Sequence, residues 1–205
     1  MPPVTFTDTQ TWYASLATMY GAAAALITNP SGEVLLVKPN YRDHWSLPGG
    51  ILEHDEPPHV GCAREVAEEI GLDIVAERLL TVDWVPPAGV RTKPSVHFIF
   101  DGGTLDPARI DQIVLQAEEL DDYRFTDDYA ELVAPPTAAR IAASVKARQS
   151  GGSSAYVPCA LGSGSCPWER ASPRRDTSRS PWGSATRSAS SGICAGRPPG
   201  TGFSR

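Results

Sequence analysis

The feature that most constrains this chain is the segment of residues 50–72, GILEHDEPPHVGCAREVAEEIGL, which combines a crowd of carboxylates with a helical pattern. It holds five glutamates and one arginine, and glycines lie near both of its ends. Pro57 and Pro58 suit the first turn of a helix, and Gly71 suits a left-handed C-terminal stop. The segment therefore predicts an amphipathic helix of about three to four turns.

This predicted helix separates a packing face from an acidic face. At about 100° per residue, one stripe of small and apolar side chains forms from Val60, Ala63, Val66, Ala67 and Ile70. Glu65, Glu68 and Glu69 fall on the opposite side, where they repel one another and the helix dipole disfavours each by roughly 0.3–1 kcal/mol. A divalent cation with oxygen ligands would relieve both penalties. We therefore predict a metal site here rather than a merely solvated polar face.

The spacing resembles the signature of the Nudix hydrolase family, which is Gly, five residues, Glu, seven residues, then Arg-Glu-aliphatic-any-Glu-Glu-any-Gly-aliphatic. Every defined position is filled, by Gly50, Glu56, Arg64, Glu65, Val66, Glu68, Glu69, Gly71 and Leu72. The preceding WSLPG of residues 45–49 is also similar to the lead-in of that family. The resemblance implies hydrolysis of a pyrophosphate bond with Mg²⁺ or Mn²⁺. The substrate class would be a nucleoside diphosphate linked to another moiety, either a sugar nucleotide such as ADP-ribose or a (d)NTP-like small molecule.

The resemblance also implies roles for individual residues. The metal ligands would be Glu65, Glu68, Glu69 and the carbonyl oxygen of Gly50. Arg64 would orient the carboxylates, and Glu56 would pair with Arg64 and brace the turn into the helix. Metal-activated water would attack phosphorus, with Glu65 as one candidate for the base that takes its proton.

Four residues outside the signature are further candidates. Glu118 and Glu119 lie in LQAEELDDYRF, and Nudix enzymes often use a downstream glutamate as ligand or base. The alternative is an exposed acidic turn. Arg42 and Trp45 precede the catalytic loop and are candidates for contact with a base or phosphate, whereas Trp45 also suits a packing anchor.

Charge and composition narrow the class of partner. Residues 1–149 hold 22 acidic residues against 11 lysines and arginines, a net charge of −11. Such a domain does not attract polyanions by its long-range field, which favours a small nucleotide and argues against nucleic acid. No segment reaches the roughly 20 apolar residues of a membrane span, and the four cysteines lack metal-ligand spacing. We expect a cytoplasmic protein without a membrane partner, and the family resemblance leaves a homodimer open.

Residues 150–205 differ from the rest of the chain. They are dominated by Ser, Gly, Pro and Arg, with two acidic residues against seven arginines, and show neither strand nor helix periodicity. We predict a disordered tail after a Nudix hydrolase domain of residues 1–149. One alternative function is removal of pyrophosphate from RNA ends, aided by this basic tail. Another, from a different class, is nucleotide sensing without turnover, against which the complete acidic set argues.

The remaining patterns outline the fold. Strands are predicted at residues 22–28, 34–38, 78–85 and 95–100, another within 116–125, and helices at 127–134 and 136–148. This order predicts an α+β fold in which helices flank a mixed β-sheet, as in the α/β/α sandwich of the Nudix family.

Overall fold

The computed structural model of the chain describes residues 8–76, 78–151 and 155–158. Its strands are β1 (Tyr20–Thr28), β2 (Val34–Pro39), β3 (Gly49–Ile51), β4 (Leu79–Val85), β5 (Ser95–Thr104), β6 (Leu120–Thr126) and β7 (Ala155–Pro158). Its helices are α1 (Thr9–Ala14), α2 (Pro58–Ile70), α3 (Pro107–Ile110), α4 (Tyr129–Leu132) and α5 (Pro135–Ser150). The predicted helix of the acidic segment and all the predicted strands are therefore present, with boundaries shifted by a few residues.

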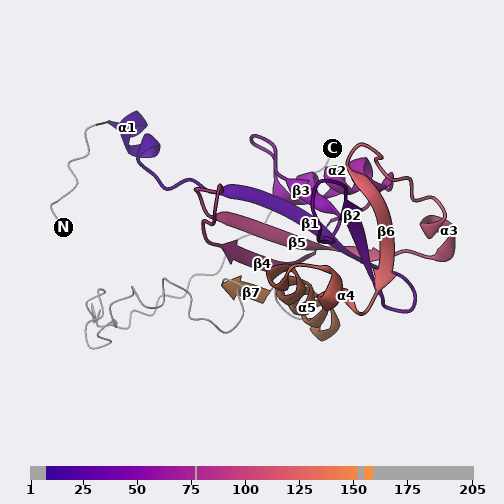
Figure 1. The fold of residues 1–205 in the computed structure, drawn as a ribbon. Coiled ribbons are helices and arrows are strands. Elements are labelled where there is room, and N and C mark those ends of the chain that lie inside the picture. Colours follow the sequence, from indigo (N-terminus) through magenta and orange to yellow (C-terminus); the bar gives the residue numbers. More distant parts are fainter. Residues whose placement is uncertain (1–7, 77, 152–154, 159–205) are drawn as a thin grey trace, which may run out of the picture. The chain divides into compact units, whose positions relative to one another are not determined.

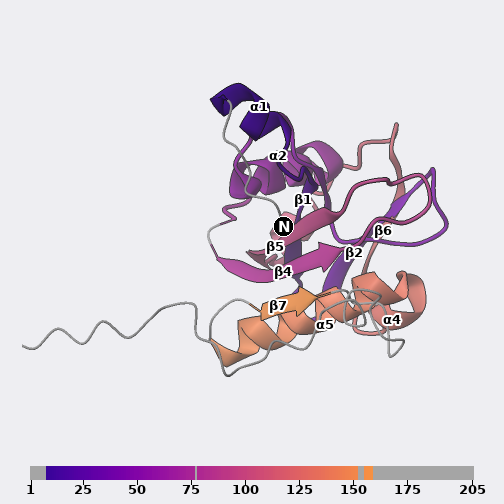
Figure 2. The same cartoon turned by 90° about the vertical axis from the view of Figure 1, so that its left-hand side faces the viewer.

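These elements build one mixed sheet between helices. The strand order is β6-β2-β1-β5-β4-β7, and β3 pairs with β1 beside this path. The β1/β5 and β4/β7 pairs are parallel, and the other pairs are antiparallel. Helix α2 covers one face, and α4 and α5 cover the other (Figures 1 and 2). The predicted α+β sandwich with a mixed sheet is confirmed.

Strand β3 brings the glycine pair of the acidic segment to the sheet. Strands β1 and β2 form a hairpin in which Thr28, at the C-terminal end of β1, lies opposite Val34. Nearer the N-terminal end of β1, its neighbour is β3, and Ala24 lies opposite Gly49. Gly49 has a φ of 142°, and a Cβ there would lie 2.3 Å from the carbonyl oxygen of Ala23. Only glycine permits this approach, so the backbone at residues 49–51 lies directly beside β1.

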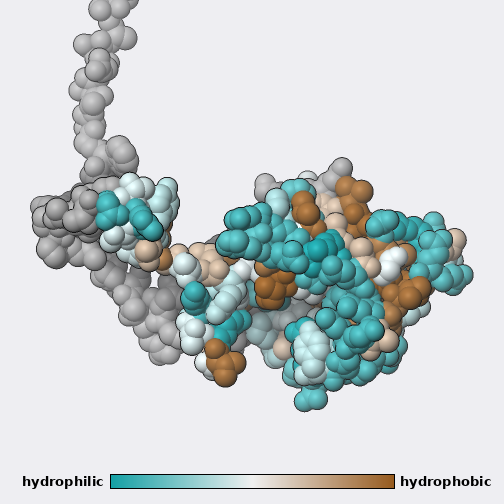
Figure 3. Space-filling view, turned by 90° about the horizontal axis from the view of Figure 1, so that it is seen from above, coloured by the Kyte–Doolittle hydropathy of each residue, from teal (hydrophilic) through white to brown (hydrophobic). Residues whose placement is uncertain are grey.

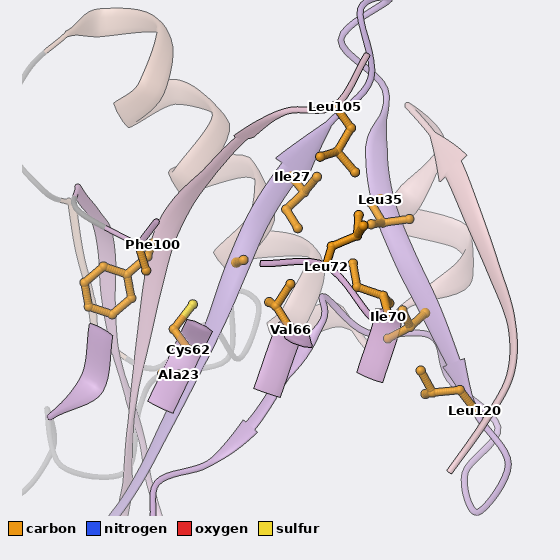
Figure 4. Packing of buried hydrophobic residues seen from close by; sticks show 13 residues of the cluster. Ala23, Ile27, Leu35, Cys62, Val66, Ile70, Leu72, Phe100, Leu105 and Leu120 are labelled. Carbon is orange, nitrogen blue, oxygen red and sulfur yellow. The ribbon is translucent and has the colours of Figure 1, made fainter. Parts of the chain in front are cut away.

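The core has one hydrophobic cluster on each face of the sheet. Under α2, Cys62, Val66 and Ile70 pack against side chains from the sheet, including Ile27 and Leu35 (Figure 4). The thiol of Cys62 is fully buried, and burial raises its pKa to about 12. Cys62 therefore packs as a small hydrophobic side chain. Under α5, a second cluster contains residues such as Leu26, Leu36, Leu80 and Ile141.

The packing face of α2 is rotated from the predicted one. Val60, placed on the packing stripe by the helical wheel, is 47% exposed, whereas Glu69, placed on the acidic face, is 5% exposed. The prediction was wrong at these two positions. Glu69 can face the protein interior because its carboxylate accepts a hydrogen bond from a backbone N–H of β3.

A short strand lies within the region predicted to lack regular structure. Residues 155–158 form β7, which runs parallel to β4 at the edge of the sheet. An unpaired sheet edge offers backbone N–H and C=O groups to any extended segment, and four residues are too few to show a strand pattern in the sequence. The rest of the predicted tail, from residue 159 onward, lies outside the described residues. Among the helices the structure describes, none is long and apolar enough to cross a membrane.

Candidate metal and catalytic site

The two ends of α2 position the site. Pro57 occupies the N-cap and Pro58 the first helical position, and Gly71 ends the helix with a φ of 71°. At the C-terminal end, the carbonyl oxygens of Glu69 and Ile70 accept hydrogen bonds of 3.0 Å from the N–H groups of Gln116 and Val114. These carbonyls have no partner within the helix. These two hydrogen bonds hold the segment that precedes residues 118 and 119 against the C-terminal end of α2.

Arg64 connects three of the predicted carboxylates. Its Nε and Nη2 donate to the two carboxylate oxygens of Glu56, at 2.8 and 3.0 Å. Its Nη1 donates to Glu68 at 2.9 Å, and its Nη2 also donates to Glu65 at 3.1 Å and to the Ile51 carbonyl oxygen at 3.3 Å. The planar guanidinium fork matches this arrangement better than a lysine could. The pairing of Arg64 with Glu56 is thus as the resemblance implied.

The members of this cluster differ in the direction of their pKa shifts. Hydrogen bonds from Arg64, and then one from the N–H of Glu53, lower the pKa of Glu56 to about 2. The Glu56 bonds also raise the pKa of Arg64, so both groups stay ionised. Burial raises the pKa of Glu65, although Arg64 opposes that effect and Glu68 and Glu119 add to it. Glu56 therefore belongs to a stable ion pair, while Glu65 stands among repelling charges.

Glu69 is the most perturbed carboxylate of the site. It accepts a hydrogen bond of 2.7 Å from the N–H of Gly49. Burial raises its pKa to about 7, the negative charges of Glu65 and Glu119 add to the rise, and the Gly49 bond and the charge of Arg42 oppose it. Two further negative charges thus act on a buried acid, and a bound cation would relieve this repulsion.

Gly50 leaves room for the Glu65 carboxylate. A Cβ at position 50 would lie 2.4 Å from the nearer oxygen of Glu65, so the Glu65 carboxylate would have to shift. The predicted ligands Glu65 and Gly50 are therefore in contact, on α2 and β3 respectively. A side chain at position 50 would displace the Glu65 carboxylate from this contact.

The donor set fits a hard divalent cation. It consists of carboxylate and carbonyl oxygens, which Mg²⁺ and Mn²⁺ prefer, and burial raises the pKa of two of its acids, Glu65 and Glu69. In the part of the chain that the structure describes, no three His, Cys, Asp or Glu side chains surround a common point as a ready-made metal cage. The carboxylates of Glu65 and Glu68 are instead directed to Arg64, and that of Glu69 to Gly49. Metal binding would therefore require these carboxylates to move toward a common point.

The downstream glutamates differ from each other. The charge of Glu119 reaches both Glu65 and Glu69, which places its carboxylate beside the site. Glu118 contributes its carbonyl oxygen, which accepts a hydrogen bond of 2.9 Å from the Asn40 side chain, while its own side chain is exposed. Of the two candidates, the structure brings Glu119 to the acidic cluster.

The two candidates for substrate contact, Arg42 and Trp45, lie in different surroundings. Arg42 lies close enough to lower the pKa of Glu69. The ring of Trp45 is partly buried against the hydrophobic cluster under α5, and the backbone N–H of Trp45 donates to the Leu132 carbonyl oxygen. The packing role weighed for Trp45 is therefore present, and its contact with a substrate stays a prediction.

Sequence reasoning missed two groups that hold the site together. The N–H of Gly49 binds Glu69, and the N–H of Asn40 donates to the Glu119 carbonyl oxygen at 2.9 Å. Backbone donors leave no signal in residue types, so only the tertiary structure reveals them.

Viewed from above relative to Figure 1, the surface is mostly hydrophilic with small hydrophobic patches (Figure 3).

The chain is similar in sequence and fold to known proteins. Residues 19–148 match the NUDIX domain family. A MutT-like protein from Streptomyces ambofaciens is 35% identical over 79 residues, 36% of this chain and 51% of that protein. An 8-oxo-dGTP diphosphatase from Proteus vulgaris is 36% identical over 62 residues, 28% of this chain and 55% of that protein. The crystal structure of a MutT protein from Methanosarcina mazei Go1 superposes with a TM-score of 0.53 at 25% identity, covering 67% of this chain and 99% of that chain.

The family match spans more than half of the chain and includes all of α2 and the sheet from β1 to β6. The chain therefore belongs to the NUDIX domain family. It spans about half the length of the curated relatives described above.

Proposed function

We propose that this chain hydrolyses a pyrophosphate bond within a small nucleotide, with Mg²⁺ or Mn²⁺ as its cofactor. The observation that carries the proposal is the convergence of Glu65 and Glu69 with the backbone of β3, next to the Arg64 ion pairs. We propose Glu65, Glu68, Glu69 and the carbonyl oxygen of Gly50 as the metal ligands. The burial of Glu65 and Glu69 beside each other supports a functional role, because burying like charges costs stability.

The chain's own residues position the reaction. When bound, the divalent ion supplies a Lewis acid that activates water and neutralises charge on the phosphoryl oxygens. Arg64 keeps Glu56 and the start of α2 in register with the carboxylates, and Gly49 holds Glu69. Glu65 and Glu119 are the two candidates for accepting the proton of the attacking water. Glu65 is supported by its contact with Gly50, and Glu119 by its proximity to both acids.

The substrate is proposed to be a (d)NTP-like small molecule. The relative named 8-oxo-dGTP diphosphatase supports this class, and the acidic domain disfavours long polyanions. A sugar nucleotide such as ADP-ribose is the second candidate class, since it presents the same pyrophosphate group to the carboxylates.

A substrate panel tests this proposal. The full chain is incubated with Mg²⁺ or Mn²⁺ and dNTPs, 8-oxo-dGTP, ADP-ribose, dinucleoside polyphosphates or 5′-triphosphorylated RNA, with an EDTA control. We expect metal-dependent cleavage of small nucleotides, with ¹⁸O from labelled water in one of the phosphate products. Cleavage that persists in EDTA, or tight nucleotide binding without any turnover, would contradict the proposal.

A further inference from the structure

Strand β6 ends the sheet and leaves one of its backbone edges open. Among the strands that the structure describes, β2 is the single neighbour of β6, which lies at the opposite end of the sheet from β7 (Figure 1). The strand runs over seven residues, from Leu120 to Thr126. An edge strand of this length presents N–H and C=O groups to which another extended strand can bind. The outer side of β6 can therefore accept a further strand.

The hydrogen bonds around Tyr123 show which backbone groups point outward. Tyr123 stands opposite Val37 in the β2/β6 pair. The N–H and C=O of Val37 bond to the backbone of Ser46, at 2.9 and 3.0 Å, and so point away from β6. Opposed residues of an antiparallel pair either bond to each other or both point away, so the N–H and C=O of Tyr123 point to the open edge. The Tyr123 N–H accordingly donates to the side chain of Asp122, at 2.8 Å.

The charged residues on either side of Tyr123 have opposite signs. Asp122 and Arg124 are exposed and, because they are two residues apart in a strand, they lie on the same face of the sheet. That face is the one under α5, since Arg124 stands opposite Leu36 of the hydrophobic cluster there. The guanidinium carbon of Arg124 lies 5.1 Å from the ring centroid of Trp45. A guanidinium stacked on a ring keeps the N–H groups of its edge available to a carboxylate.

This arrangement is complementary to itself. When two copies of β6 run antiparallel with Tyr123 opposite Tyr123 of the second copy, Asp122 of each copy stands opposite Arg124 of the other. The two tyrosines then exchange two backbone hydrogen bonds, because their N–H and C=O groups point outward. The adjacent pairs of Asp122 with Arg124 are consequently of the non-hydrogen-bonded type, in which side chains approach most closely. A two-fold axis thus produces two ion pairs from one acid and one base.

We infer that β6 is the interface of a homodimer, in which two copies of this chain join edge to edge about Tyr123 into one continuous sheet. The inference goes beyond the proposed function and is independent of it. On association, the Tyr123 N–H exchanges the Asp122 carboxylate for the carbonyl oxygen of Tyr123 of the second copy. The freed carboxylate then binds Arg124 of the second copy. The group that covers the strand edge in the monomer thereby becomes a contact of the dimer.

A charged edge strand can also prevent such pairing. Asp122 alone would act in that way, because like carboxylates on two strand edges repel each other. Arg124, two residues later, reverses the sign of the interaction in the two-fold arrangement. The net charge of −11 on residues 1–149 still opposes association over longer distances. We therefore expect a weak, transient dimer of the kind that small interfaces form.

Charge reversal within the pair tests this interface by sedimentation velocity of the full chain. A salt concentration of about 0.15 M screens the long-range repulsion between copies, and protein concentrations from about 1 μM to about 1 mM cover the range of weak association. The wild type is expected to change from monomer to dimer within this range. Asp122→Arg and Arg124→Asp should each raise the dimer dissociation constant at least about tenfold, because both opposed pairs become like-charged.

An equimolar mixture of these two variants is the most specific measurement. In a mixed dimer, every opposed pair again joins an arginine to an aspartate. The dissociation constant of the mixture should therefore return to within about threefold of the wild type, which misfolded variants could not produce. Lys146→Asp and Asp73→Arg change the net charge by the same amounts at exposed positions away from β6, and each should keep the wild-type dissociation constant.

Three sedimentation results would overturn the inference: a wild-type monomer at every concentration, dimers that persist equally in both single variants, and a mixture that associates no better than its components. Hydrogen exchange locates the interface directly. The amides of Tyr123 and of Phe125, the next residue that points outward, should exchange more slowly at high than at low protein concentration. Slow exchange at every concentration would mean that another segment of the same chain covers the edge, which would exclude a second copy as its occupant.

Discussion

Replacing Glu69 with glutamine should stabilise the metal-free protein at neutral pH while abolishing its turnover. Glu69 is 5% exposed, and burial together with neighbouring acids raises its pKa from 4.5 to about 7. The folded state therefore holds the proton more tightly than the unfolded state. The stabilisation by this proton is fully present below pH 4.5 and is lost as the pH rises through about 7.

The magnitude follows from the pKa difference. At about 1.4 kcal/mol for each pKa unit, the shift corresponds to about 3 kcal/mol of unfolding free energy. Glutamine keeps a carbonyl oxygen for the Gly49 N–H and carries no charge. We therefore expect Glu69→Gln to exceed the wild type in unfolding free energy by up to about 3 kcal/mol at pH 8, and this difference should shrink to near zero toward pH 5.

The assay is urea denaturation in EDTA at pH 5, 6, 7 and 8, followed by tryptophan fluorescence. Glu131→Gln, which removes an exposed acid from α4, should follow the wild-type pH dependence. Addition of Mg²⁺ at pH 8 should raise the midpoint of the wild type and leave Glu69→Gln unaffected, because only a bound ligand stabilises the folded state. Parallel pH curves for wild type and Glu69→Gln, or retained turnover in Glu69→Gln, would refute this reasoning.

Three further changes probe the site and its support. Arg64→Ala should lower kcat/KM about 100-fold through misplaced carboxylates, and unchanged kinetics in a folded variant would contradict the positioning role. Gly50→Ala should weaken the Mg²⁺ dependence of activity about tenfold or more, because its Cβ would lie 2.4 Å from Glu65; an unchanged Mg²⁺ titration would count against it. Arg140→Met should cost about 3–5 kcal/mol in urea denaturation, since Asp83 is fully buried and bonded to Arg140 at 2.7 Å; a loss below about 1 kcal/mol would show that the pair is dispensable.

Local rules succeed where short-range chemistry decides the outcome. Pro57 and Gly71 mark the limits of α2 because their backbone preferences act within one turn. The strands from β1 to β6 were predicted, except for β3, because most of them alternate or run apolar for several residues. Strand β3 has three residues, two of them glycines, and exists because β1 offers a partner. No pattern of so few residues can predict such pairing.

The helical wheel failed at Glu69 for a reason that is not local. The wheel places charged side chains on the solvent side. The burial of Glu69 depends instead on the N–H of Gly49, twenty residues earlier in the chain. The raised pKa of Glu69 follows from that burial and from the approach of Glu119, whose turn is tied to Asn40 and to the end of α2. These contacts join segments that are distant in sequence.

The sequence by itself determined the family, the helix that carries the acids and the identity of the candidate ligands, because these depend on residue types at fixed spacing along one element. The tertiary structure alone decided which acids meet. It buried Glu69 against Gly49, moved Glu65 against Gly50, brought Glu119 rather than Glu118 to the cluster, and placed Arg124 on Trp45. The physical reason is that burial, electrostatic coupling and ring stacking depend on distances through space, which the order of residues along the chain does not contain.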